Sequence, residues 1–156
     1  MALIKSISGI RGTIGGQAGE ALTPVDVVKF AAAFGTWVLQ TTGNNTIIVG
    51  RDARLSGDMV NKLVCATLQG LGINVVDLGL STTPTVEMAV PDYKAGGGII
   101  LTASHNPKQW NALKLLNHKG EFISDAEGKL VLELADKEAF EFAQVNDLGK
   151  YQRDDE

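Results

Sequence analysis

The chain is poor in the residues that would connect it with secretion, nucleic acid or a membrane. It has 156 residues and one cysteine, Cys65, so no internal disulfide can form, which is typical of a reducing compartment. Lys and Arg number 14 against 18 Asp and Glu, whereas general nucleic-acid binding needs clustered cations. The longest charge-free run, residues 30–50, is interrupted by polar residues and is no membrane span. We therefore expect a cytoplasmic protein that binds neither nucleic acid nor membrane.

Length and composition predict one globular domain. A domain typically has about 100 to 200 residues, and 44% hydrophobic residues are enough for a sizeable core. We expect the domain to cover residues 1–145. Residues 146–156 are polar and are expected to be a frayed tail or the start of a linker to a further domain.

Short apolar, β-branched runs alternate with helical patterns along the middle of the chain. This order predicts a three-layer α/β/α domain with a mixed, mostly parallel sheet, whose functional loops follow the carboxyl ends of the strands. The expected elements are a helix from Pro24 to about Thr42, a strand over 46–50, a helix capped by Ser56 and ending near Gly70, a strand over 73–78, a helix over 84–90 and a strand over 98–102.

The two ends of the chain give other signals. Five glycines among the first twenty residues predict a loop region there. The turn-rich segment 117–120 is flanked by residues 113–116 and 121–123, which suggests a β-hairpin and makes the sheet mixed. A last helix is expected over 124–142, with acidic residues in its first turn.

Several common sites are absent from the sequence. It contains no Gly-x-Gly-x-x-Gly and no Walker-type lysine, which excludes the usual dinucleotide and nucleoside triphosphate loops. With two histidines and one cysteine, we expect no zinc site made from this chain alone.

The most informative segment is Thr102-Ala103-Ser104-His105-Asn106-Pro107, which follows a predicted buried strand. From the residues alone, a functional loop and an ordinary Ser-x-x-Pro turn are about equally supported. A serine acyl nucleophile would need a Gly-x-Ser-x-Gly elbow and an acid–histidine pair, which are not found. Phosphoryl chemistry fits better, because a serine can carry a phosphate of charge about −1.5 to −2 that Arg, Lys, backbone N–H groups and a metal can meet.

Two further motifs accompany this segment, which itself continues to Asn111 and Lys114. They are Ser8-Gly9-Ile10-Arg11-Gly12 and Gly50-Arg51-Asp52-Ala53-Arg54-Leu55-Ser56. Together and in this order, the three motifs resemble the N-terminal Gly-x-Arg-Gly loop, the Gly-Arg-Asp-x-Arg-x-Ser segment and the phosphoserine loop of domain I of the α-D-phosphohexomutases, the family of phosphoglucomutase, phosphomannomutase and phosphoglucosamine mutase. The resemblance covers about residues 4–145. The chain departs from the family at Lys5-Ser6-Ile7, where Phe-Gly-Thr is common, and at Ala112, where Gly is common.

The resemblance implies a mutase that moves a phosphoryl group between the C1 and C6 oxygens of a hexose phosphate. Phosphorylated Ser104 would donate to the free hydroxyl, and the bisphosphorylated sugar would return its other phosphate to Ser104. The family's Mg²⁺ would bind phosphorylated Ser104 and aspartates of a second domain, so Ser104 would be its only ligand in this chain. As domain I of four, the chain alone is expected to be inactive, with the downstream domains of the same protein as its partners.

The resemblance also implies roles for other residues. Arg11 would supply positive charge, Lys114 would act as general acid/base, and His105 would help Asn106 to orient the phosphate. Thr102 and Arg51 are assigned to phosphate or substrate binding.

Plain structural roles and other functions stay open at this stage. Arg11 can be a charged turn residue and Lys114 an edge lysine, while Arg51 and Arg54 can pair with the aspartates beside them. The chain can instead be a non-catalytic module that binds phosphorylated sugars, or an interaction domain on an α/β scaffold.

Overall fold

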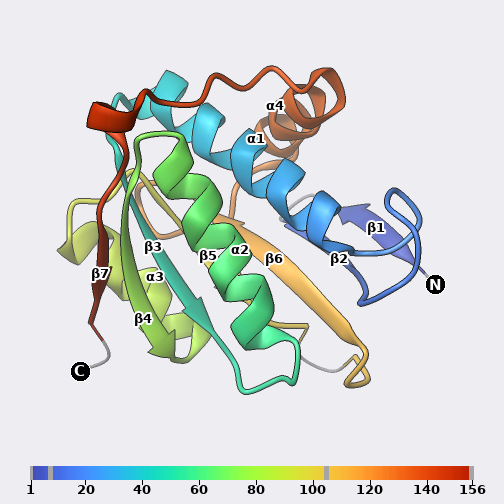
Figure 1. Ribbon diagram of the computed structural model, residues 1–156. Coiled ribbons are helices and arrows are strands. Elements are labelled where there is room, and N and C mark those ends of the chain that lie inside the picture. Colours follow the sequence, from blue (N-terminus) through green and yellow to red (C-terminus); the bar gives the residue numbers. More distant parts are fainter. Residues whose placement is uncertain (1, 7–8, 104–105, 155–156) are drawn as a thin grey trace.

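The computed structural model of the protein describes residues 2–6, 9–103 and 106–154. Within these residues a seven-stranded sheet has the strand order β1-β2-β6-β5-β3-β4-β7, with β1 and β7 at its two edges (Figure 1). The elements are β1 Leu3–Ser6, β2 Gly9–Thr13, α1 Pro24–Thr42, β3 Thr46–Arg51, α2 Gly57–Gly70, β4 Asn74–Leu80, α3 Thr83–Asp92, β5 Gly97–Leu101, β6 Trp110–Leu116, α4 Asp125–Lys137, a short 3-10 helix Val145–Asp147 and β7 Tyr151–Arg153.

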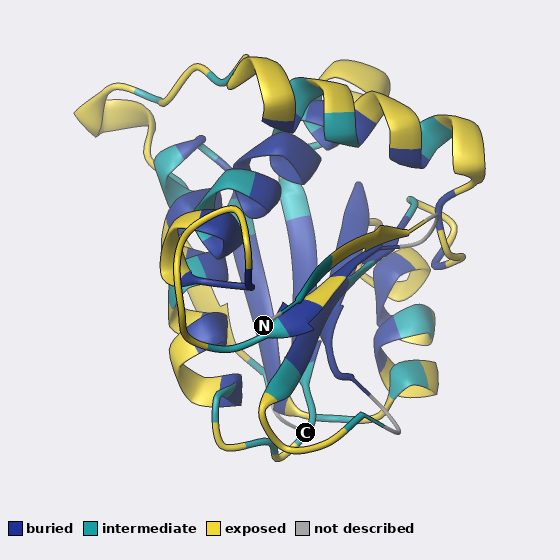
Figure 2. Ribbon diagram, turned by 90° about the vertical axis from the view of Figure 1, so that its right-hand side faces the viewer, coloured by how far each residue is buried: buried dark blue, intermediate teal, exposed yellow. Residues whose placement is uncertain are grey.

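Helices cover both faces of this sheet. α1 packs against α2 and α4 on one face, whereas α3 packs against β3 and β5 on the other (Figures 1 and 2). The expected three-layer α/β/α domain with a mixed sheet is therefore confirmed. Of the described strand pairings, three are parallel and three are antiparallel. The antiparallel pairings are β1 with β2, β2 with β6, and β6 with β5. No described helix is both long enough and apolar enough to span a membrane.

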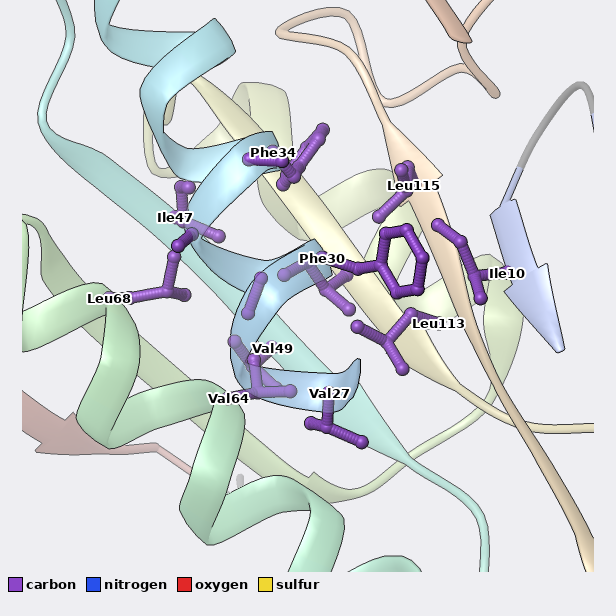
Figure 3. Packing of buried hydrophobic residues seen from close by; sticks show 14 of the residues in the cluster. Ile10, Val27, Phe30, Phe34, Ile47, Val49, Val64, Leu68, Leu113 and Leu115 are labelled. Carbon is purple, nitrogen blue, oxygen red and sulfur yellow. The ribbon is translucent and has the colours of Figure 1, made fainter. Parts of the chain in front are cut away.

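Helix α1 is the centre of the larger core. It starts with a capping box, in which Thr23 and Asp26 satisfy each other's backbone N–H groups, and it ends at Gly43 with a left-handed φ of 67°. Phe30 and Phe34 are almost completely buried, and the Phe30 ring lies among Ile10 and the leucines of β6 (Figure 3). Burial of such a side chain stabilises the fold by about 1.5 to 3 kcal/mol.

The prediction of a loop over the first twenty residues is wrong for β1 and β2. A Cβ at Gly9 would collide with the Leu113 carbonyl oxygen of β6, and one at Gly12 would lie 2.5 Å from the Ala2 carbonyl oxygen. These two glycines therefore allow close backbone approach within the sheet. The loop prediction fits Gly15 and Gly19, both of which have positive φ.

The predicted hairpin between 113–116 and 121–123 is also not formed. β6 lies between β2 and β5, and only an isolated bridge joins Leu116 to Phe122. The reason is that β6 carries buried apolar residues on both faces, as an interior strand requires. Lys114 is consequently on an interior strand and is not an edge lysine. The last long helix ends at Lys137, earlier than predicted, because Glu138 adopts a left-handed φ of 47°.

The prediction of a polar tail from residue 146 is wrong for β7, which pairs in parallel with β4. The Tyr151 hydroxyl donates a 2.5 Å hydrogen bond to the fully buried carboxylate of Asp77. That carboxylate also accepts from the Asn61 side-chain amide and the Gly79 backbone N–H, each at 2.9 Å. A buried carboxylate needs such donors, so β7 completes the polar environment of Asp77.

The bond between Tyr151 and Asp77 gives a pH prediction. This hydrogen bond, aided by desolvation, raises the pKa of Tyr151 from 10.0 to about 12. Because the neutral phenol is favoured in the folded state, the stability that the bond contributes is complete below pH 10 and is lost as the pH rises to about 12. The chain has two tyrosines, so the phenolate absorbance of the wild type minus that of Tyr151→Phe is expected to rise near pH 12. Half-ionisation of Tyr151 near pH 10 would contradict the bond.

Candidate functional site

Two loops lie side by side at the carboxyl ends of the parallel strands, at the lower edge of the sheet in Figure 1. One follows β3 from residue 52 to 56, and the other runs from the end of β5 to the start of β6. The backbone N–H of Asp52 donates to the Leu101 carbonyl oxygen at 3.1 Å, so the two loops begin next to each other. This is the edge at which open α/β sheets present their sites.

Arg54 crosses from the first loop to the second. Its Nη1 donates to the carbonyl oxygens of Pro107 at 2.7 Å and Trp110 at 3.1 Å, and its Nη2 donates to the carbonyl oxygen of Asn106 at 2.8 Å. The Arg54 side chain is 12% exposed. The guanidinium thus holds the backbone of the segment 106–110.

Asp52 links the same arginine to the other side of the second loop. Its Oδ2 accepts a 2.7 Å hydrogen bond from the Thr102 hydroxyl and lies 3.4 Å from Nε of Arg54, while its Oδ1 accepts from the Arg54 backbone N–H at 3.2 Å. Thr102, which the resemblance assigns to phosphate or substrate binding, is 7% exposed. Its hydroxyl bond to Asp52 ties the end of β5 to the first loop.

A second link joins the motif after β3 to β6. The side-chain amide of the fully buried Asn111 donates to Oγ of Ser56 at 2.9 Å. Ser56 precedes α2 as predicted, but its hydroxyl makes no capping hydrogen bond, because it faces Asn111. The neighbouring Ala112 lies in β6, paired with Arg11, and the described non-glycine residues with positive φ are elsewhere in the chain. This position therefore requires no left-handed turn.

Arg11 and Lys114 form the second part of the candidate site. Both line a pocket of about 210 Å³ between β2 and β6. In the antiparallel register, Arg11 pairs with Ala112 and Lys114 with Gly9, so Lys114 is the diagonal neighbour of Arg11 on one face of the sheet. Ile10 and Leu113, which alternate with them, belong to the core under α1. The two cations therefore lie on the opposite face, at strands that α3 does not cover.

The other predicted residues are placed separately. The Arg51 guanidinium donates to the Asp52 carbonyl oxygen at 3.3 Å and lies beside Gly57 at the start of α2. Lys62, through a hydrogen bond, and then Arg51, through its charge, lower the pKa of Asp58. The described side-chain contacts of Arg51 are thus with its own loop and with the start of α2, and none of them is with the loop that carries Asn106. Ser104 and His105 lie outside the described residues.

The described part of the chain contains no group of three or more His, Cys, Asp or Glu residues that could hold a metal ion. A surface hollow of about 490 Å³ lies at the opposite end of the sheet and includes none of the motif residues. The described residues alone therefore form a loop anchor and a cationic pocket.

Sequence reasoning missed the roles of Arg54 and Asp52. A detectable signal existed, because Asp52 and Thr102 follow adjacent parallel strands and polar residues at neighbouring carboxyl ends are expected to meet. The predicted pairing of Arg54 with a nearby aspartate is found at Asp52. The three carbonyl contacts of Arg54 carry no such signal, since every residue has a carbonyl oxygen.

The chain is similar to known proteins over most of its length. Residues 3–142 match the family model for phosphoglucomutase/phosphomannomutase, alpha/beta/alpha domain I. A phosphoglucomutase/phosphomannomutase of Thermococcus kodakarensis is 36% identical over 148 residues, covering 92% of this chain and 32% of that protein. A phosphoglucosamine mutase of Sulfurovum sp. is 33% identical over 137 residues, covering 87% of this chain and 30% of that protein.

A solved structure gives the same result. The crystal structure of a phosphoglucomutase/phosphomannomutase family protein from Burkholderia thailandensis superposes with a TM-score of 0.82 at 26% sequence identity, covering 97% of this chain and 33% of that one. The chain thus spans about a third of the length of these relatives.

Proposed function

Because the chain belongs to the phosphoglucomutase/phosphomannomutase family, of which it contains the α/β/α domain I, we propose that it is the phosphoserine domain of a phosphohexomutase. The full-length protein would move a phosphoryl group between the C1 and C6 oxygens of a hexose phosphate through phosphorylated Ser104 and a bisphosphorylated sugar. The observation that carries this proposal is the shared pocket of Arg11 and Lys114, since these cations come from two separate motifs and meet on one sheet face.

The proposed step conserves atoms and protons. In the first transfer the bond between phosphorus and Oγ of Ser104 breaks, while a bond forms between phosphorus and the free sugar hydroxyl oxygen. The proton of that hydroxyl passes through Lys114 to Oγ of Ser104. The second transfer reverses these events at the other phosphate of the sugar, which regenerates phosphorylated Ser104. No water is consumed and no hydrolysis occurs.

The protein's contribution to such a transfer is positioning and electrostatic stabilisation, because the transferring group carries its charge on three equatorial oxygens. Arg11 is exposed on the uncovered face and is proposed to offset this charge. His105 and Asn106 are proposed to orient the phosphate. Arg51, beside α2, is proposed to act on substrate from the neighbouring loop.

Mg²⁺ is proposed as the cofactor of the full-length protein, where it would neutralise phosphate charge. The described residues of this chain do not form a metal site by themselves, so phosphorylated Ser104 would be its only ligand here and further domains would supply the others. Since the chain spans about a third of its relatives, we propose that it acts with downstream domains and is inactive alone. The free, buried Cys65 is compatible with the proposed cytoplasmic location.

Ser104 provides the direct test. Mass spectrometry of the full-length protein is expected to find one phosphate on Ser104. Ser104→Ala is expected to lower phosphoryl transfer between the C1 and C6 positions of glucose, mannose or glucosamine phosphates by at least about 10³-fold, because the covalent intermediate cannot form.

The matched control is Ser81→Ala, which changes another serine at the carboxyl ends of the strands and should keep wild-type activity. A protein without phosphate or transfer activity, whose melting temperature still rises with sugar phosphates, would instead be a binding module. If sugar phosphates also leave the melting temperature unchanged, an interaction domain is the better account.

A further inference from the structure

We propose that Arg54 is a positioning residue for the transfer reaction, which fixes the backbone on both sides of Ser104 without contacting the substrate. This inference rests on the proposed function. From the sequence, Arg54 was expected only to pair with a nearby aspartate. The contacts of its guanidinium point to another role.

Both terminal nitrogens of the Arg54 guanidinium donate to backbone carbonyl oxygens. The three acceptors, in Asn106, Pro107 and Trp110, lie 2.7 to 3.1 Å away. A planar guanidinium has its donors in a fixed fork, so three such bonds define the course of the loop and not only its distance from the arginine. Since the side chain is 12% exposed, the guanidinium is largely enclosed by the loop that it holds.

Backbone hydrogen bonds also hold the described part of this loop, but Pro107 has no backbone N–H. The Asn106 N–H donates to the Ala103 carbonyl oxygen at 2.9 Å, the Trp110 N–H donates to the Pro107 carbonyl oxygen at 3.0 Å, and the Ile14 N–H donates to the Gln109 carbonyl oxygen at 2.7 Å. The bonds to the carbonyl groups of Asn106 and Trp110 are partly buried, where such groups need donors, and Arg54 supplies them. Asp52, 3.4 Å from Nε, offsets the charge that this burial would otherwise leave uncompensated.

The same arginine acts on the other side of Ser104 through Asp52, which accepts the Thr102 hydroxyl at 2.7 Å. Thr102 and Asn106 each lie two positions from Ser104 in the sequence. A residue spans at most about 3.3 to 3.6 Å of chain, so anchors this close restrict the positions that Ser104 can reach. An error of about 1 Å at a reacting group can cost about 10²-fold in rate.

The test compares Arg54→Gln, Arg54→Lys and Arg54→Ala in the full-length protein. Arg54→Gln is expected to lower kcat about 10²-fold with KM for the sugar phosphate changed less than about threefold, because substrate binding does not involve Arg54. Arg54→Lys keeps the charge but not the fork and is expected to be equally impaired. Added guanidinium ion is expected to restore part of the activity of Arg54→Ala and none of that of Ser104→Ala.

Two kinetic results would overturn the proposal. Wild-type kcat in Arg54→Lys would show that only charge matters, and a raised KM with unchanged kcat in Arg54→Gln would show that Arg54 contacts substrate. Tyr151→Phe is the control for general destabilisation, since it weakens the fold at the opposite edge strand.

Hydrogen exchange of the backbone amides of residues 108–112 separates this inference from the proposed function. Exchange is expected to be faster in Arg54→Gln and unchanged in Tyr151→Phe. This readout does not need activity, so it tests the anchor even if the wild-type protein transfers no phosphate. Unchanged exchange in Arg54→Gln would overturn the inference and leave the proposed function standing.

Discussion

Lys114→Gln in the full-length protein is expected to lower kcat for phosphoryl transfer by about 10²- to 10⁴-fold, the range that general acid–base catalysis typically contributes. Lys114 is on the interior strand β6 and lines the same pocket as Arg11. The proton of the attacking sugar hydroxyl must reach the leaving oxygen of Ser104, and Lys114 is the residue proposed to carry it. Kinetic assays with a hexose 1-phosphate measure the loss.

Lys114→Arg distinguishes proton transfer from charge. Arginine keeps the positive charge but does not lose a proton in proteins, so this variant is expected to be as inactive as Lys114→Gln. The control is Lys119→Gln, which removes an exposed lysine from the turn after β6. If Lys114→Arg retains at least half of the wild-type kcat, the role of Lys114 is electrostatic and the proton takes another route.

Asp77→Ala is expected to lower the free energy of unfolding by about 3 to 5 kcal/mol, because each buried donor left without an acceptor costs about 1 to 3 kcal/mol. The substitution would remove the acceptor of the Asn61 amide, the Gly79 N–H and the Tyr151 hydroxyl. Tyr151 is 46% exposed and can turn to water, so most of the cost comes from the first two groups. Folded domains are stable by about 5 to 15 kcal/mol, so the loss is a large fraction.

Urea unfolding measures this loss as a lower midpoint at an unchanged slope. Tyr151→Phe removes only one donor and is expected to cost about 1 kcal/mol, and Asp147→Ala, at an exposed position, should cost less than about 0.5 kcal/mol. A value for Asp77→Ala within about 1 kcal/mol of the wild type would mean that β7 and α2 are held by other contacts.

Local signals explain which elements could be predicted from the sequence. Thr23, Pro24 and Asp26 specify the start of α1 within one turn, and Gly43 specifies its end. Strands β3 and β5 contain continuous apolar runs, and β4 is apolar on either side of Asp77, which is typical of parallel strands covered on both faces. For these elements, the signals that predict the helix or strand lie within that element or directly beside it in the sequence.

The parts that could not be predicted depend on distant partners. β7 is polar, and its position depends on Asp77, which lies inside an otherwise apolar strand. Glycine is a common turn residue, but Gly9 lies in a strand. Its role depends on the close approach of β6, which lies more than a hundred positions later in the sequence. β6 itself pairs with β2 and with β5, and only an isolated bridge joins it to Phe122. Local propensity does not report such contacts.

The candidate site also combines features that the sequence predicts with contacts that depend on distant residues. The pairing of Arg11 and Lys114 in one pocket is consistent with the roles that the motifs implied. The interactions of Arg54 with Asn106, Pro107 and Trp110 were not predicted, because they involve main-chain oxygens. The hydrogen bond from the Thr102 hydroxyl to Asp52 was not predicted either, since the two residues are fifty positions apart in the sequence.

Arg54 holds the segment 106–110 through main-chain oxygens, and this has an evolutionary consequence. Carbonyl oxygens are the same in every amino acid, so mutations at the exposed positions Lys108 and Gln109 leave the acceptors of Arg54 unchanged. The loop can therefore accumulate new side chains, and with them new surface chemistry, while its path is maintained by a residue more than fifty positions away. Sequence drift in this loop and preservation of its shape are thus compatible.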